Sequence, residues 1–272
     1  MRFGYRDIDP ASAGPANRDW WSRNAQEYLA DHGSFLGDAD FCWCPEGIRE
    51  SQAHLLGPLD TLREQAVLEV GAGAAQCSRW LTSHGVDVIA TDISEGMLAQ
   101  ARALDQRTGI TVRTRRADAR DLPFADSSFD VVFTAFGAVP FVPDAAALHR
   151  EVARVLYPGG RWLFSVTHPF KWVFPDDPGP GGLTVVRPYF DRTPYVELDD
   201  AGAPAYAEFH RTIGDHIRDL RSAGFTIRDL IEPQWPSDLT QTWGSWSPMR
   251  GALFPSTAIF VTSLEAKADG DG

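Results

Sequence analysis

The chain has 272 residues, and 25 lysines and arginines against 37 aspartates and glutamates give it a formal net charge of −12. This acidity argues against nucleic acid binding, because sequence-independent affinity for phosphates comes from lysine and arginine. Hydrophobic residues make up 43% and charged residues 23% of the chain, which excludes a fibrous or wholly disordered protein.

Residues 1–60 contain two amphipathic segments, WWSRNAQEYLA and GIRESQAHLL, and predict a helical cap ahead of the first core strand. No apolar leader opens the chain, and the most apolar stretch, residues 129–148, is interrupted by proline, glycine and aspartate. We therefore expect a cytoplasmic protein without a membrane-spanning helix. Three cysteines, Cys42, Cys44 and Cys77, cannot all pair and are one ligand short of a four-cysteine zinc site, so we expect free thiols and no metal.

Over residues 66–167, short β-branched runs alternate with amphipathic segments, which predicts a parallel sheet built from βαβ units. Strands are expected at 66–70, 86–91, 110–116, 129–135 and 160–167. The helix before the last of these is expected over 144–156, with Asp144 as its N-cap and a stop at Pro158-Gly159-Gly160.

A segment rich in proline, glycine and aromatic residues follows at 168–206, and we expect 183–190 and 194–199 to be hairpin strands within it. A helix over 207–223 and two strands, FTIRDLI and STAIFVTSL, would bring the sheet to seven strands. The predicted organisation is a single domain, 1–264. It consists of a helical cap (1–60), a cofactor-binding core (61–167), a substrate-side insertion (168–206) and the last helix and strands (207–264), with a frayed tail at 265–272.

The segment VLEVGAGAAQCSRWL leads from the first core strand through Gly71-Ala72-Gly73 into a helix. Such a loop lets a ligand approach the backbone at the carboxyl end of a parallel sheet. Asp92 ends the second strand, 19 residues after Gly73, where a carboxylate can accept hydrogen bonds from both hydroxyls of a ribose. These features predict an adenosine ligand.

Two residues argue against a dinucleotide as that ligand. Gln76 replaces the third glycine of the dinucleotide fingerprint, which allows close packing beside a pyrophosphate. Glu69 lies two residues before Gly71, and its carboxylate would repel phosphates. A ligand with a cationic amino-acid end, such as S-adenosylmethionine, suits this loop better.

Residues 66–167 resemble the class I S-adenosylmethionine-dependent methyltransferases, in particular the small-molecule branch with the signature hh(D/E)hGxGxG, whose third glycine is Ala75 here. ADARDLPFADSSFDVVFTAFGAVPFV and EVARVLYPGGRWLFSV are similar to later segments of that family. The resemblance implies an α/β, Rossmann-like fold with a seven-stranded, mostly parallel sheet whose last strand is antiparallel.

The resemblance also implies roles for individual residues. Asp92 would bind the ribose hydroxyls, Asp118 and Ala119 would lie near the adenine, and Ala135 and Phe136 would lie near the methionine end. The complete set of predicted cofactor-binding residues is Tyr28, Trp43, Glu69, Gly71, Ala72, Gly73, Gln76, Asp92, Ile93, Met97, Asp118, Ala119, Ala135 and Phe136.

His168 directly follows the fifth strand and is the candidate catalytic base, because histidine accepts protons near neutral pH. The aromatic residues of the cap and the insertion suit a flat organic acceptor, or a cation held over a ring face, and the net charge of −12 favours neutral or cationic compounds over polyanions. We predict an enzyme that transfers a methyl group from S-adenosylmethionine to an oxygen or nitrogen of a small molecule, leaving S-adenosylhomocysteine, with neither nucleic acid nor membrane as partner. Oligomeric state is open. The alternatives are an NAD-dependent oxidoreductase, a non-catalytic S-adenosylmethionine sensor and a thiol- or arsenite-directed methyltransferase.

Overall fold

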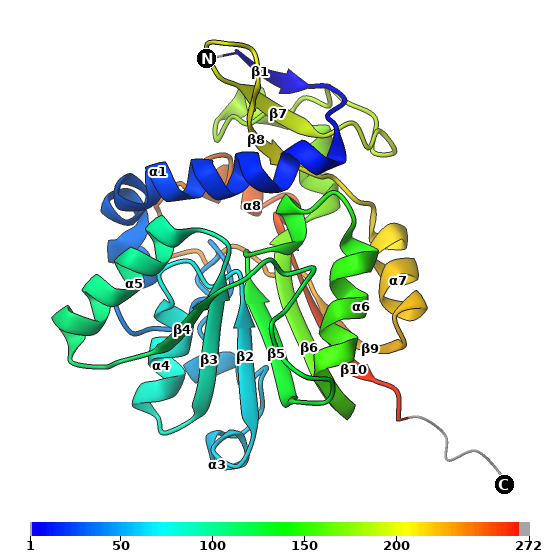
Figure 1. Ribbon diagram of the computed structural model, residues 1–272. Helices are drawn as coiled ribbons and strands as arrows, with labels where there is room; N and C mark the ends of the chain where they lie inside the picture. The colour runs from blue at the N-terminus through cyan, green and yellow to red at the C-terminus, as the bar shows by residue number, and fades with distance from the viewer. Residues whose placement is uncertain (1, 267–272) are drawn as a thin grey trace, which may run out of the picture.

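The structure is a computed structural model that describes residues 2–266, and its centre is a seven-stranded sheet in the order β4-β3-β2-β5-β6-β10-β9 (Figure 1). β10 is antiparallel to both of its neighbours, and the other neighbouring pairs are parallel. The predicted seven-stranded, Rossmann-like sheet is therefore confirmed. Its strands are β2 (Ala66–Val70), β3 (Asp87–Asp92), β4 (Arg113–Arg116), β5 (Phe129–Ala135), β6 (Leu156–Thr167), β9 (Phe225–Ile231) and β10 (Thr257–Leu264).

Helices cover both faces of this sheet because successive strand residues point to opposite sides. On one face, Leu68 and Val132 belong to the same core cluster as Val152 of α6 (Ala145–Val155) and Leu220 of α7 (Ile213–Ser222). On the other face, Val67, Val131 and Leu163 pack with residues of α4 (Gln76–Ser83) and of the N-terminal segment. α5 (Glu95–Thr108) lies beside α4 and contacts β3 and β4. Asp144 caps α6 as predicted, since its side chain accepts a hydrogen bond from the nitrogen of Ala147.

The N-terminal region contains one long helix, α1 (Pro10–Leu36), which lies across the carboxyl edge of the sheet (Figure 1). Two short helices follow, α2 (Glu50–Ala53) and α3 (Leu59–Leu62), so the second predicted amphipathic helix is reduced to four residues. A strand that was not predicted, β1 (Arg2–Tyr5), precedes α1. Among the described residues, no helix combines the length and apolarity needed to cross a bilayer.

A second, three-stranded sheet lies beyond α1, in the order β1-β7-β8 with β7 (Tyr195–Leu198) and β8 (Pro204–Glu208) (Figure 1). The predicted strand at 183–190 is wrong, since that segment holds the end of a 3₁₀ turn, η3 (Pro180–Leu183), and then irregular chain. The true hairpin turns at 199–203, where the side chain of Asp199 accepts from the nitrogen of Ala203 at 2.8 Å and Gly202 adopts a φ of +85°. This sheet is therefore formed by two distant parts of the chain.

The helix predicted from residue 207 begins later, at Ile213. Ala207 and Glu208 continue β8, and a reciprocal capping box between Thr212 and Asp215 fixes the start of α7. The remaining short elements are η1 (Val139–Phe141), η2 (Pro169–Val173) and α8 (Pro248–Gly251). Of the predicted frayed tail, Glu265 donates its backbone N–H to the carbonyl of Gly224 at 2.9 Å, and residues 267–272 lie outside the described residues.

Candidate active site

A cavity of about 160 Å³, here called the small cavity, lies at the carboxyl ends of β2, β3 and β5. β2 and β5 are the neighbours at which the strand order reverses, and open α/β sheets bind ligands at this point. All of the predicted cofactor residues except Trp43 line it, namely Tyr28, Glu69, Gly71, Ala72, Gly73, Gln76, Asp92, Ile93, Met97, Asp118, Ala119, Ala135 and Phe136.

The glycine loop after β2 forms one wall of the small cavity. Gly71 has a φ of +66°, and a Cβ on it would lie 2.6 Å from the backbone nitrogen of Ala138, so only glycine fits. Ala75, at the third glycine position of the signature, also adopts a left-handed conformation, with a φ of 58°. The side-chain nitrogen of Gln76 is buried and has no hydrogen-bond partner among the described residues. The loop therefore combines close backbone approach with an unused donor.

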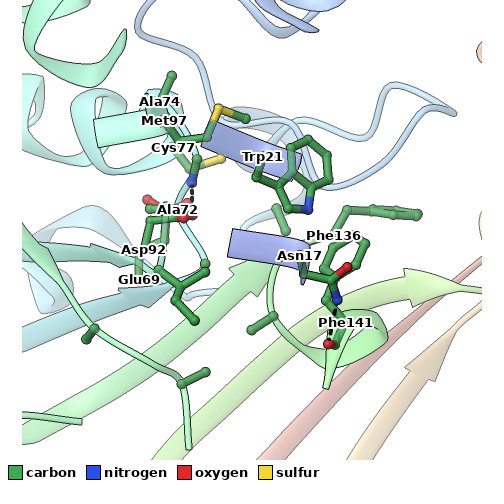
Figure 2. Close-up of a pocket in the computed structure, with 18 of the residues that line it drawn as sticks. Asn17, Trp21, Glu69, Ala72, Ala74, Cys77, Asp92, Met97, Phe136 and Phe141 are labelled. Atoms are coloured by element: carbon green, nitrogen blue, oxygen red, sulfur yellow. Dashed lines mark hydrogen bonds between the residues drawn. The ribbon is translucent and has the colours of Figure 1, made fainter. Parts of the chain in front are cut away.

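Two buried carboxylates border the same cavity (Figure 2). Asp92 accepts hydrogen bonds from the backbone nitrogens of Gly73 and Ser94, each at 2.8 Å. Glu69 accepts from both the backbone nitrogen and the hydroxyl of Ser78. Burial raises the pKa of Asp92 to about 6 and that of Glu69 to about 7, in each case against the opposing effect of these hydrogen bonds. Carboxylate oxygens accept more than one hydrogen bond, so both groups keep capacity for a ligand.

Asp118 lies at another part of the small cavity and is already engaged with Arg120. The guanidinium donates to its two carboxylate oxygens at 3.0 and 2.7 Å, and the backbone nitrogen of Arg120 donates at 2.9 Å. Burial acts to raise the pKa of Asp118, but the hydrogen bonds and charge of Arg120 outweigh it and the pKa is lowered. Asp118 is therefore held as a carboxylate in a fixed orientation.

Phe136, directly after β5, marks one boundary of the small cavity. Its φ of 57° is unusual for a bulky residue and is stabilised by its backbone N–H, which donates to the hydroxyl of Ser165 at 3.1 Å. In Figure 2, Phe136, Trp21 and Phe141 lie across the cavity from Glu69 and Asp92. The strained backbone fixes an aromatic ring at this position.

A second cavity, of about 810 Å³ and here called the large cavity, adjoins the first. Seven residues line both, namely Trp21, Tyr28, Leu36, Cys42, Ala135, Phe136 and Phe141. Much of the rest of its lining comes from the three-stranded sheet β1-β7-β8, here called the small sheet, from η2 and from the segment 243–246. Trp20, the segment 43–45 and the segment 174–176 also contribute, and many of the lining residues are aromatic. A ligand in one cavity would therefore meet a ligand in the other at these shared residues.

The small sheet presents an alternating set of polar side chains to the large cavity. Tyr195 is paired with Glu208 across β7 and β8, and Glu197 is paired with Tyr206, so two tyrosines and two glutamates share one face. The hydroxyl of Tyr206 donates to Glu208, and that of Tyr195 donates to Glu197 at 3.2 Å. Burial raises the pKa of Glu208.

The opposite face of this hairpin is fixed to α1. Val196 and Ala207 form an apolar cluster with Ala13. The side-chain nitrogen of Asn17 donates to the carbonyls of Phe141 and Ala207, both at 2.9 Å, and its oxygen accepts from the nitrogen of Ala207 at 2.8 Å (Figure 2 shows the bond to Phe141). Asn17 therefore holds the small sheet and the loop after β5 in place.

Two predicted site residues lie elsewhere. Trp43 is fully buried, lines the large cavity and not the small one, and donates its indole N–H to Glu50 at 2.8 Å. His168 lines neither cavity: its Nε2 lies 2.9 Å from Glu232, and its Nδ1 accepts from the nitrogen of Phe170 at 3.0 Å. The structure therefore gives His168 a place in the turn after β6.

The cysteines are free and buried. Burial raises the pKa of all three thiols, to about 11 for Cys42, which keeps them protonated and poorly nucleophilic. No group of three or more histidine, cysteine, aspartate or glutamate side chains in the described part of the chain has the arrangement to hold a metal ion. The buried, protonated cysteines give no support to the thiol- or arsenite-directed alternative.

Sequence reasoning missed Asn17, Lys171 and the tyrosine–glutamate face of the small sheet. The alternation of Tyr195 with Glu197 and of Tyr206 with Glu208 was a readable signal of two half-buried strands. Nothing local marks Asn17 or Lys171, because their positions depend on segments more than 60 residues away in sequence.

Comparisons with known proteins agree with this architecture. The family described as "Methyltransferase domain" matches residues 68–164. The demethylmenaquinone methyltransferase of Clavibacter sepedonicus is 43% identical over 100 residues, which are 36% of this chain and 39% of that protein. The chain also spans about a third of the length of three similar curated relatives, which are uncharacterized mycobacterial proteins.

Solved structures extend the similarity over more of the chain. An S-adenosylmethionine-dependent methyltransferase from Mesorhizobium loti has a TM-score of 0.58 and 28% identity, covering 77% of this chain and 99% of that one. The 1,6-didemethyltoxoflavin-N1-methyltransferase of Burkholderia thailandensis, solved with its substrate and S-adenosylhomocysteine, shares the fold with a TM-score of 0.59 and 19% identity, over 97% and 95% of the two chains. These matches support S-adenosylmethionine as the cofactor, since the Mesorhizobium loti protein is named as dependent on it. Residues 68–164 therefore match a methyltransferase domain, and most of the chain shares the fold of an S-adenosylmethionine-dependent methyltransferase.

Proposed function

We propose that the protein transfers the methyl group of S-adenosylmethionine to an oxygen or nitrogen of a small, flat organic acceptor. The observation that carries this proposal is the junction of the two cavities, where seven residues contribute to both linings. A cofactor in the small cavity and an acceptor in the large cavity would meet there. Such a junction is what an in-line displacement requires, because the two reacting atoms must be aligned and kept from water.

The small cavity fits the cofactor in its chemistry. Asp92 would accept the ribose hydroxyls, and Asp118 with Ala119 would lie at the adenine. Glu69 places a carboxylate at the glycine loop, and the unpaired Gln76 amide supplies a donor. When bound, S-adenosylmethionine supplies a methyl group activated by a positively charged sulfur. We assign Ala135 and Phe136 to the methionine end of the site.

The large cavity supports a small organic acceptor. Its lining includes Trp20, Trp172, Trp246, Tyr195 and Tyr206, whose rings suit a flat molecule. Relatives named as methyltransferases of demethylmenaquinone and didemethyltoxoflavin act on small organic molecules of this kind. The net charge of −12 does not favour a nucleic acid as substrate.

The test uses the purified full chain. Calorimetry should show binding of S-adenosylmethionine and S-adenosylhomocysteine and no binding of NAD. A screen of small phenols, enols, amines and heteroaromatic compounds should then give S-adenosylhomocysteine release with at least one class, and Asp92→Asn should abolish that release at low cofactor concentration. Binding without release from any acceptor would instead indicate a sensor, and binding of NAD alone would refute the cofactor assignment.

A further inference from the structure

Lys171 is the most unusual group in the large cavity. It lies on η2, three residues after His168, and only 9% of it is exposed. Among the described residues, its Nζ has no hydrogen-bond or ion-pair partner, and it lies instead over the Trp246 ring, 3.5 Å from the centroid. Lys171 lines the large cavity, and its Nζ is not one of the described polar atoms that are both fully buried and unpartnered, so the amine faces the cavity, where a ligand group can complete its hydrogen bonds.

The place of Lys171 is close to the junction of the two cavities. The Trp246 ring under its Nζ meets the Phe136 ring edge-on, with 5.6 Å between centroids. Phe136 lines both cavities. One aromatic ring therefore separates the amine from the residue at which cofactor and acceptor would meet.

From these contacts we infer that Lys171 is the proton acceptor for the reaction and that the acceptor is a neutral phenol or enol, methylated on oxygen. This inference rests on the proposed function and narrows it. Lys171 accepts the hydroxyl proton, so the O–H bond breaks and an N–H bond forms. The oxygen electron pair forms the new C–O bond as the C–S bond breaks with its pair remaining on sulfur. The ammonium of Lys171 then returns its proton to water.

The charges around Lys171 fit this role. Burial lowers the pKa of its ammonium to about 8, so a substantial fraction is neutral amine near that pH. Asp176, Glu208 and Glu46 act in the opposite direction and stabilise the ammonium that proton transfer creates, while Arg250 opposes it. Lys171 can therefore exist both as the neutral amine and as the ammonium.

The same charges argue for a neutral acceptor. Three carboxylates, Asp176, Glu197 and Glu208, line the large cavity together with the single amine of Lys171. A carboxylic acid would enter a site that is already negative, and a permanent cation would meet Lys171 near the junction. A hydroxyl that ionises only after binding avoids both costs.

The test compares Lys171→Met and Lys171→Arg with the wild type in the presence of S-adenosylhomocysteine. The probes are 4-nitrophenol, its methyl ether 4-nitroanisole, and 4-nitrobenzoate. The visible absorption of 4-nitrophenol reports its ionisation, and it should bind as the phenolate below the pH at which it ionises in solution. Lys171→Met should lose that band and about tenfold or more in affinity for 4-nitrophenol, with affinity for 4-nitroanisole unchanged.

Lys171→Arg separates charge from proton transfer. It should keep the phenolate band and the methylation of 4-nitrophenol, because guanidinium is a cation and this phenol can enter already ionised, but lose methyl transfer to phenols that are not ionised in solution, because guanidinium does not accept a proton. Wild-type kcat/KM should rise with pH, and Lys171→Met should lose this rise. Lys171→Met should remain folded in a thermal melt, since it replaces a buried charge with an apolar side chain of similar length.

The inference is overturned if neither nitrophenol nor nitroanisole binds, if nitrophenol binds in its neutral form, or if Lys171→Met leaves its binding unchanged. A preference for 4-nitrobenzoate that depends on Lys171 would show that the residue is an anion-binding group, and this would refute its role as the base. S-adenosylhomocysteine binding is measured separately. If the cofactor binds and the acceptor screen yields only methylated amines, the proposed function stands and this inference falls, whereas failure of cofactor binding removes the proposed function itself.

Discussion

The carboxylate of Asp92 accepts a hydrogen bond from the backbone nitrogen of Gly73 at 2.8 Å, which ties the end of β3 to the glycine loop after β2. This single contact joins the ribose-binding candidate to the loop that approaches the cofactor. The small cavity is therefore held by its own residues before any ligand arrives.

Asp92→Asn should weaken S-adenosylhomocysteine binding by about 10- to 100-fold, since a hydrogen bond to a charged group contributes about 1.5–3 kcal/mol. Isothermal titration calorimetry measures this. The matched control is Asp60→Asn on α3, at the opposite end of the sheet, whose side chain is 93% exposed (Figure 1). Near-normal affinity of Asp92→Asn would refute the ribose assignment.

Gly71→Ala should reduce stability and cofactor affinity far more than the same substitution at another left-handed glycine. The new Cβ would lie 2.6 Å from the nitrogen of Ala138, whereas at Gly109, with a φ of +71°, an added Cβ would have no atom within 4 Å. Gly109→Ala should cost about 1–2 kcal/mol of unfolding free energy from its conformation alone and keep cofactor affinity. Gly71→Ala should lose more stability and bind no S-adenosylhomocysteine. Equal melting temperatures and affinities in the two variants would contradict the close approach.

Glu69 should make the ligand-free protein less stable as the pH rises. Its pKa is about 7 in the folded chain against an ordinary value of 4.5, so the folded state holds the proton more tightly than the unfolded state. The resulting stability is fully present below about pH 4.5 and is lost as the pH rises through 7, at about 1.4 kcal/mol per pKa unit. Urea unfolding at pH 5 and 8 measures the loss.

Glu69→Gln removes this titration and should flatten that dependence. Some slope should remain, because Asp92, with a pKa of about 6 in the folded chain, acts in the same direction. An identical loss of unfolding free energy in wild type and Glu69→Gln between pH 5 and 8 would show that Glu69 is ionised throughout.

His168→Ala should lower the melting temperature and leave kcat at saturating acceptor unchanged. The ring caps the turn at η2 through the nitrogen of Phe170 and lies 2.9 Å from Glu232. Burial lowers the pKa of His168, against the effect of Glu232, so the fall in melting temperature should not depend on a charged imidazolium. A large fall in kcat with cofactor affinity preserved would restore His168 as the catalytic base.

Local chemistry made much of the core predictable. The β2–loop–α4 segment, Asp92 at the end of β3 and the cap of α6 each depend on residues within a few turns of chain, and their expected positions agree with the structure. Boundaries were less accurate, as at β4, which begins at Arg113 because its pairing with β3 starts opposite Ile89. The hydrophobic periodicity of a strand does not specify where its pairing with the neighbouring strand begins.

The parallel core, the glycine loop and the carboxylates around it can be read from the sequence, because strand alternation, helix caps and tight turns are short-range effects. The acceptor side depends on long-range contacts. β1 pairs with β7 across about 190 residues, the ring of His168 turns to Glu232, and Lys171 lies over Trp246. These contacts follow from packing between segments that are distant in sequence, where the free energy of burial selects partners that no local pattern specifies.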